Sequence, residues 1–146
     1  MAELSFSGLD ELILSMQEVA EIPDNVQDEM LNAGADVVVR AQQQAAQSMG
    51  VQDTGLTISK IKKTKVKVKR GKRVIYIYPQ GTRVRGKGEN GKPVRVRNAE
   101  IAFINEYGTR RQAARPFVLQ GNETSAEETT QAQATVYYRW LETKGL

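Results

Sequence analysis

The chain has 146 residues, of which 40% are apolar, 6% aromatic and 26% charged, and this composition is typical of one globular domain with a core of its own. It contains no histidine and no cysteine, so the commonest catalytic bases, nucleophiles and soft metal ligands are missing and a disulfide scaffold is excluded. No apolar window approaches the roughly 20 residues of a membrane span, and the acidic start Met1-Ala2-Glu3 is unlike a signal peptide.

The net charge of +4 conceals three segments of very different sign. Residues 1–59 carry ten acidic side chains and one basic one, residues 60–97 carry fifteen basic and one acidic, and residues 98–146 carry five basic and six acidic. Their balances are therefore −9, +14 and −1. Because like charges are gathered in this way, we expect the folded domain to have an acidic side and a basic side. Such a surface suits head-to-tail packing of subunits as well as contact with nucleic acid.

Two helices are predicted in the first 50 residues, after a short alternating strand over residues 3–7. Apolar residues recur every three or four positions over residues 9–21 and again over residues 24–49. The second helix should run for about 25 residues. It should end at Gly50, since glycine suits the left-handed position after a helix. We expect both helices to cover one face of a sheet.

The pattern changes to β from residue 56, and residues 56–119 are expected to hold an antiparallel sheet of about four strands. Lysines alternate with valines over residues 65–69, which predicts a strand with one basic face. Residues 70–72 predict a turn. The next run, Val74–Tyr78, is apolar on both faces and is therefore predicted to be the central strand.

Residues 80–97 predict a projecting two-stranded arm. Two short alternating runs of arginine and valine flank a glycine-rich stretch, in which Asn90-Gly91 supplies the left-handed residues of a tight hairpin turn. We expect the valines on one face of this arm and the arginines on the other. The cations available to contact a partner or DNA are Arg83, Arg85, Lys87, Lys92, Arg95 and Arg97.

Residues 99–117 predict an exposed, basic corner between two buried anchors. The apolar run over residues 101–104 is long enough for one buried strand or a short helix. Gly108 suits a backbone position that a side chain would crowd, and Pro116 fixes its own φ and extends the residue before it. The expected core anchors are Phe103, Pro116 and Phe117.

A final helix is predicted over residues 122–146, ending near Thr143. Gly121-Asn122 is expected to break the chain, and the residues that follow offer a capping box. The second half of the helix has apolar side chains to bury, namely Val136, Tyr137, Trp140 and Leu141. The whole chain is thus expected to form one α+β domain, residues 1–146, with a helical region over residues 1–50, the sheet, and this closing helix.

The motifs indicate no catalytic, cofactor or metal site. Gly86-x-Gly88-x-x-Gly91 matches the dinucleotide fingerprint, but strand-forming residues follow it where that motif needs a helix N-terminus. A nuclease would need acidic residues beside the basic segment, which offers only Glu89. Asp53-Thr54-Gly55 is the triplet of aspartic proteases, but those enzymes need two copies that share a proton. We therefore expect a protein that is not an enzyme, and a small hydrolase is the weakest alternative.

Two motifs resemble those of a known family. Phe103–Thr109, reading F-I-N-E-Y-G-T, followed by the A-R-P-F of residues 114–117, is similar to the closing motif of the small head–tail joining, or tail-completion, proteins of long-tailed bacteriophages. The triplet Asp53-Thr54-Gly55 resembles a second element of that family. The likeness covers most of the chain, although the arm is longer than usual and Leu56 follows the triplet without an intervening residue.

The resemblance implies a structural virion protein at the phage neck, assembled in the host cytoplasm. The protein would be a connector subunit that forms a ring, most simply a hexamer matching the tail tube. Its neighbours would be head-completion or adaptor proteins on one side and tail-tube or tail-terminator proteins on the other. The interface residues that the two motifs imply are Asp53, Thr54, Gly55, Glu106, Tyr107, Gly108, Thr109, Arg110, Arg111 and Arg115.

The main alternative is a basic nucleic-acid-binding protein that acts alone. In that case the arm and the lysine-rich strand would contact phosphate groups, and inside a tail channel the same cations could touch the genome without reading its sequence. Nucleic-acid binders usually place aromatic residues among the cations, and none lies between Arg83 and Arg97. We therefore favour docking to protein partners as the role of the arm.

Overall fold

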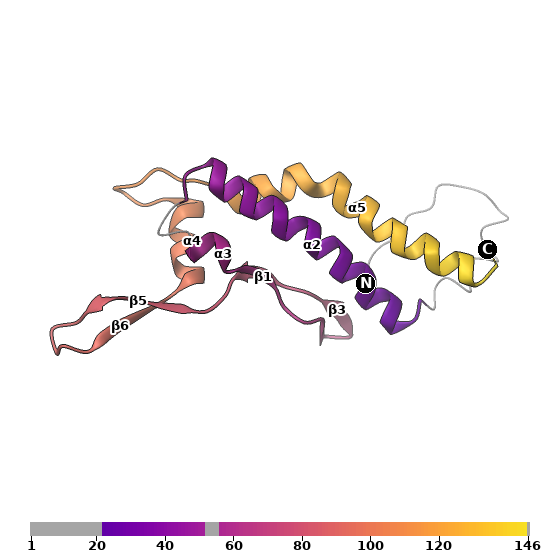
Figure 1. The fold of residues 1–146 in the computed structure, drawn as a ribbon, viewed down its shortest axis with the longest axis horizontal. Coiled ribbons are helices and arrows are strands. Elements are labelled where there is room, and N and C mark those ends of the chain that lie inside the picture. Colours follow the sequence, from indigo (N-terminus) through magenta and orange to yellow (C-terminus); the bar gives the residue numbers. More distant parts are fainter. Residues whose placement is uncertain (1–21, 52–55, 146) are drawn as a thin grey trace.

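The computed structural model describes residues 22–51 and 56–145, and these residues form the predicted α+β fold (Figure 1). The strand expected over residues 3–7, the helix over residues 9–21 and the triplet Asp53-Thr54-Gly55 lie outside the described residues.

Two long helices, α2 (Asp24–Ser48) and α5 (Phe117–Thr143), lie side by side and antiparallel along the molecule. Two β-hairpins lie below them in the view of Figure 1. The short helices α3 (Leu56–Ser59) and α4 (Asn98–Tyr107) lie at the end where α2 finishes and α5 begins. The described residues thus form a helical layer above a β layer.

Helix α2 has the length and the end predicted from its apolar periodicity. Its last turn closes in a Schellman motif, in which Val51 N–H donates to the Ala46 carbonyl at 2.9 Å and Gly50 N–H donates to the Gln47 carbonyl at 3.2 Å. Gly50 has a φ of 71°, a left-handed conformation that glycine adopts without steric cost. Val51 is fully buried, so the chain turns back into the core at this point.

Helix α2 packs mainly along α5, whereas a broad sheet beneath it was predicted. The two helices approach closely at Gly121, where a Cβ would lie 2.7 Å from Gln42 Cα. Gly121 therefore does not break the chain but lies inside α5, where it allows this close approach. Gln42 also donates from Nε2 to Asn122 Oδ1 at 2.9 Å.

The predicted end of α5 at Thr143 is confirmed, whereas its start is at Phe117 instead of residue 122.

Between residues 56 and 119, where one sheet of about four strands was predicted, the structure has three two-stranded antiparallel sheets. The pairs are β1 (Ile61–Lys63) with β4 (Ile77–Pro79), β2 (Lys67–Lys69) with β3 (Lys72–Val74), and β5 (Thr82–Lys87) with β6 (Pro93–Arg97). The first two pairs are parts of one long hairpin, residues 61–79, which we call the inner hairpin. The third pair is the arm.

The inner hairpin is continuous although its strands are interrupted. Thr64 N–H donates to the Tyr76 carbonyl at 2.8 Å, so the two sides stay paired between the sheets. The tip is the predicted turn, with a positive φ at both Arg70 (52°) and Gly71 (77°). Such a turn matches the right-handed twist of the strands on either side.

The run from Val74 to Tyr78 is not the central strand that its apolar character predicted. Strand β3 ends at Val74 and β4 begins only at Ile77. Ile77 packs against the core, whereas Tyr76 and Tyr78 are exposed, because only one side of this ribbon is covered by the body.

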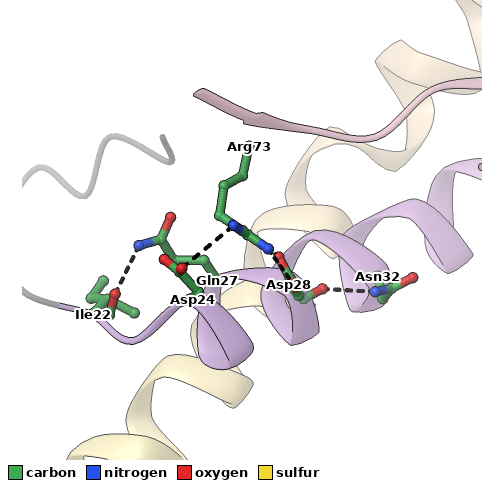
Figure 2. A network of polar contacts seen from close by, with 6 residues as sticks. All are labelled: Ile22, Asp24, Gln27, Asp28, Asn32 and Arg73. Carbon is green, nitrogen blue, oxygen red and sulfur yellow. Dashed lines mark hydrogen bonds and ion pairs between the residues drawn. The ribbon is translucent and has the colours of Figure 1, made fainter. Parts of the chain in front are cut away.

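Ion pairs fasten the inner hairpin to α2 (Figure 2). Arg73 donates to both carboxylate oxygens of Asp28, with 2.7 Å between Nη2 and Oδ2, and its Nη1 lies 3.6 Å from Asp24 Oδ2. The hydrogen bond from Arg73 holds the pKa of Asp28 below its ordinary value of 3.8. Lys63 Nζ lies 2.7 Å from Asp36 Oδ1, about two turns further along α2. The hairpin is thus held at two points on the helix.

The arm forms the projecting hairpin that the sequence predicted, and it extends away from the body in Figure 1. Its register pairs Arg83 with Val96 and Val84 with Arg95. Directly paired residues lie on the same face of a two-stranded sheet. Each face therefore mixes arginine with valine, and the predicted division into an arginine face and a valine face is wrong.

Residues 101–104 lie in helix α4. The sequence allowed either a buried strand or a short helix for this run, and the structure has the helix. Ala102 joins a buried cluster at this end of the molecule, composed of Ala45, Ala46, Val51, Ile61, Ala102 and Phe117. A second cluster includes the predicted Val136 and Tyr137 and is composed of Val26, Met30, Val136 and Tyr137. No helix in the described part of the chain is both long and apolar enough to span a membrane.

Phe117 is a core anchor, as predicted, and Phe103 is not. Phe117 is fully buried and Pro116 before it is half-buried, whereas Phe103 is 64% exposed. In a strand, Phe103 would share a face with Ile101, but in a helix a side chain two positions on lies about 200° around the axis. Helix formation therefore turns Phe103 to solvent while Ile101 stays buried.

Candidate interaction surface

The loop between α4 and α5 is closed by its own hydrogen bonds. Gly108 follows α4 with a φ of 76°, and a Cβ there would lie 2.8 Å from the Gln112 carbonyl oxygen. Only glycine fits this position, as predicted. Thr109 Oγ1 accepts hydrogen bonds from the N–H groups of Arg111 and Gln112, both at 3.2 Å. We call residues 105–117 the corner.

Asn105 and Arg115 fix the corner to the body. Asn105 is buried, its Nδ2 donates to the Ile101 carbonyl at 2.9 Å, and its Oδ1 accepts from Gln112 Nε2 at 3.1 Å. The Asn105 carbonyl accepts from Arg115 N–H, while Arg115 Nη1 donates to the Gly50 carbonyl at 3.0 Å. Arg115 therefore ties the corner to the end of α2.

Glu106 caps the first turn of α5. Its Oε2 accepts from Val118 N–H at 2.8 Å and its Oε1 accepts from Leu119 N–H at 3.0 Å. These N–H groups have no partner within the helix, and Pro116 at the N-cap position has no side chain that could bind them. The helix dipole also favours a negative charge at this place. Within one chain the Glu106 carboxylate therefore has a structural role, because its hydrogen bonds join α4 to α5.

The corner and the helix residues on either side of it carry exposed aromatic, apolar and basic side chains. Phe103 and Tyr107 lie one turn apart on α4 with their ring centroids 4.7 Å apart, and Tyr107 is 70% exposed. Exposed apolar side chains gathered on one surface commonly mark a contact site. We define the corner surface as this aromatic pair together with the exposed residues Ile104, Arg110, Arg111 and Leu119.

The interface residues expected from the sequence fall into two groups. Those whose side chain or backbone is used in contacts that shape the corner are Glu106, Gly108, Thr109 and Arg115, and those whose side chains extend into solvent are Tyr107, Arg110 and Arg111. The other three, Asp53, Thr54 and Gly55, lie outside the described residues. Sequence reasoning missed Phe103 as a surface residue, although its four-residue spacing from Tyr107 would place both on one side of a helix. The sequence around Glu106 gives no sign that its carboxylate caps α5, because only the folded loop brings the end of α4 close to the start of α5.

The arm presents a second group of cations. At its root, Arg83 Nη2 donates to Thr57 Oγ1 at 3.2 Å, and Arg97 pairs with Glu100 at 2.8 Å. The cations nearer the tip are exposed, and among the described residues no carboxylate pairs with Arg85, Lys87, Lys92 or Arg95. The charge of the outer arm is therefore available to a partner.

Within the described ranges, no group of three or more acidic side chains lies close enough together to hold a metal ion. Comparisons with protein-family models, curated proteins and solved structures returned no match. The function must therefore be inferred from the chemistry of the corner surface and the hairpins.

Proposed function

We propose that this protein is a structural virion subunit of a long-tailed bacteriophage, which forms a ring at the junction of head and tail. The observation that carries the proposal is the corner. The closing motif with the family resemblance, Phe103–Thr109 followed by residues 114–117, forms one braced turn, which holds Phe103 and Tyr107 at the surface. Aromatic side chains on a rigid support suit protein–protein contact, because little conformational entropy is lost when they are ordered on binding.

The distribution of charge supports assembly through two unlike patches. The two hairpins hold all the basic residues of segment 60–97 except Lys60, whereas α5 exposes Glu123, Glu127 and Glu128. When two different patches of one chain meet, subunits pack head to tail and close into a ring if the rotation permits it. The proposed ring is a hexamer between head-completion or adaptor proteins and tail-tube or tail-terminator proteins.

The second candidate function is that of a basic nucleic-acid-binding protein acting alone. The observation in its favour is the group of arm cations, Arg85, Lys87, Lys92 and Arg95, that no described carboxylate neutralises. Salt dependence separates the two functions. A phosphate binder loses affinity steeply as salt rises, whereas a ring with apolar contacts keeps most of its assembly.

Virion assembly tests the proposal. In the virus that carries this gene, loss of the protein should leave completed heads and completed tails that do not join. A copy with Phe103→Asp and Tyr107→Asp should not restore joining, because charge is introduced at the corner surface. Tyr138→Asp is the matched control, since Tyr138 is an exposed tyrosine in the second half of α5. Virions that join without the protein, or normal joining with the doubly substituted copy, would reject the proposal.

A further inference from the structure

The two faces of the inner hairpin differ in chemistry. Directly paired residues share a face, and the faces alternate along each strand. One face points to α2, where Ile61 is buried and the cations Lys63 and Arg73 are paired with carboxylates. The other face is turned to solvent and carries Lys62, Lys67, Lys69, Lys72, Tyr76 and Tyr78.

The lysines and tyrosines of this outward face lie next to one another. Tyr76 is 38% exposed and Tyr78 is 43% exposed. Lys62 is the direct partner of Tyr78 in the ladder, and Lys69 Nζ lies 4.8 Å from the centre of the Tyr76 ring. Among the described residues no carboxylate pairs with Lys62, Lys67, Lys69 or Lys72. The face thus offers two aromatic rings with uncompensated cations beside them.

We propose that this face binds single-stranded nucleic acid, with phosphate groups on the lysines and bases stacked on the two tyrosines. Cations that follow a backbone and aromatic rings that receive its bases are the two parts of a general single-strand site, and every base has a π-face to stack. The arm has a comparable number of cations but no aromatic residue between Arg83 and Arg97. The combination therefore occurs on the inner hairpin, where the sequence had predicted a buried central strand.

The spacing of the rings favours a single strand over a duplex. Tyr76 and Tyr78 are two residues apart on one strand, so they are separated by about 6.6 Å. This is roughly twice the 3.4 Å between successive bases in one strand of a duplex. Bases on both rings must therefore be spread apart, which a flexible single strand permits and a stacked helix does not.

This site would belong to each single chain, so it goes beyond the ring function and does not depend on it. An acidic protein partner would also contact the lysines and could pack on the tyrosine rings, so the comparison with polyglutamate described below separates the two kinds of partner. Nucleic acid accounts for the cations and the rings together.

Fluorescence anisotropy of a labelled oligothymidylate with the purified full chain tests the proposal. If four lysines contact phosphates, the logarithm of the affinity should fall with the logarithm of salt with a slope of about −3. Tyr76→Ala with Tyr78→Ala should weaken binding about tenfold or more. Tyr76→Phe with Tyr78→Phe should bind nearly as well as the wild type, because it keeps both rings. A duplex of equal length should bind more weakly than the single strand.

A matched pair of charge variants locates the site. Lys62→Gln, Lys67→Gln and Lys72→Gln together should weaken binding more than Arg85→Gln, Lys87→Gln and Lys92→Gln on the arm. All six side chains are exposed, and thermal melting should show that both triple variants keep the fold. Equal affinity for duplex, unchanged affinity in the double alanine variant, or preference for polyglutamate over the oligonucleotide would each overturn the proposal. None of these results bears on whether the protein forms a ring.

Discussion

The inner hairpin and the arm have a similar basic composition but different relations to the rest of the molecule. The inner hairpin buries Ile61 and pairs Lys63 and Arg73 with carboxylates of α2. Among the described residues, the contacts of the arm with the body lie near its root, where Asn98 N–H donates to the Gly81 carbonyl at 3.0 Å. The two hairpins thus differ in their contacts with the core and with α2, and not in their composition.

This difference has a consequence for the stability of each hairpin. A two-stranded hairpin that packs on nothing is marginally stable in water. The inner hairpin should therefore share the stability of the core, whereas the arm should open by local unfolding with fast amide exchange. The outer arm keeps its charge for a partner, because no carboxylate of the described residues pairs with Arg85, Lys87, Lys92 or Arg95.

The largest expected effect is at Phe117, which is fully buried in the cluster that also holds Ile61. Phe117→Ala should lower the free energy of unfolding by about 3–5 kcal/mol, because it removes a large apolar side chain and leaves a cavity. Chemical denaturation followed by circular dichroism measures this change. Phe103→Ala is the control and should change stability by no more than about 0.5 kcal/mol, since that ring is exposed. Equal losses in both variants would show that Phe103 is a core residue after all.

A second pair of variants compares the hairpins directly. Ile61→Ala should cost about 2–5 kcal/mol, since Ile61 is fully buried where β1 joins the core. Val84→Ala removes an exposed apolar side chain from the arm and should change stability by at most about 0.5 kcal/mol. Hydrogen exchange should show faster exchange across the inner hairpin in the first variant only. Comparable exchange rates in the two wild-type hairpins would contradict the comparison.

A smaller effect is expected for Asp28→Asn, which removes the carboxylate that binds Arg73. The folded-state pKa of Asp28 lies below its ordinary value of 3.8, so its contribution to stability is present above that pH. It is lost as the pH falls further, through the folded-state value. The stability difference between wild type and Asp28→Asn should therefore be constant near neutral pH and shrink below about pH 4.

Denaturation of both proteins at several pH values measures this difference. Glu89→Gln at the tip of the arm is the control, because Glu89 is exposed and pairs with no described cation. A difference that grows in acid would show that the Asp28–Arg73 pair does not hold the hairpin to α2.

The smallest change in stability is expected when the arm is removed. Gly81 and Asn98 are joined by a backbone hydrogen bond, so residues 82–97 can be replaced by a two-residue Asn-Gly turn. The melting temperature should stay near that of the wild type, because the arm has few core contacts. Head–tail joining should nevertheless be lost, so that free heads and free tails accumulate. Joining at the normal rate would show that the arm has no part in assembly.

Charge reversal separates the two contacts that the arm could make. Arg83→Glu, Arg85→Glu, Arg95→Glu and Arg97→Glu together should abolish joining and leave DNA retention unchanged if the arm binds a protein. Genome leakage from joined particles would instead place these residues against DNA in the channel.

Features with a local physical cause could be predicted from the sequence. The periodicity of α2 predicted its length, Gly50 its left-handed end, and Gly91 a left-handed residue in the turn of the arm. Asn90, which was predicted to be left-handed as well, is not, because the arm closes through the longer loop of residues 88–92. Gly108 was predicted because its conformation depends only on the backbone around it. In each case the residues that determine the structure lie next to one another in the chain.

Features that depend on distant residues could not be predicted. Gly121 lies inside α5, where the absence of a side chain lets Gln42 of the other long helix approach closely. The Val74–Tyr78 run is apolar enough for a central strand, but no further strand of the described residues lies beside it, so its tyrosines face solvent. Phe103 is exposed because residues 101–104 form part of helix α4. A strand would place Phe103 on the same face as Ile101, whereas a helix places the two side chains on opposite sides.

The proposed function is tested most directly by the mass of the protein in solution. Size-exclusion chromatography with light scattering, repeated over rising concentration, should show 16.2 kDa monomers converting to a closed ring of about 100 kDa, the mass of six copies. No stable species should lie between them, because a head-to-tail ring is stable only when it is closed. A stable twofold dimer, in which one patch meets its own copy, would contradict the account.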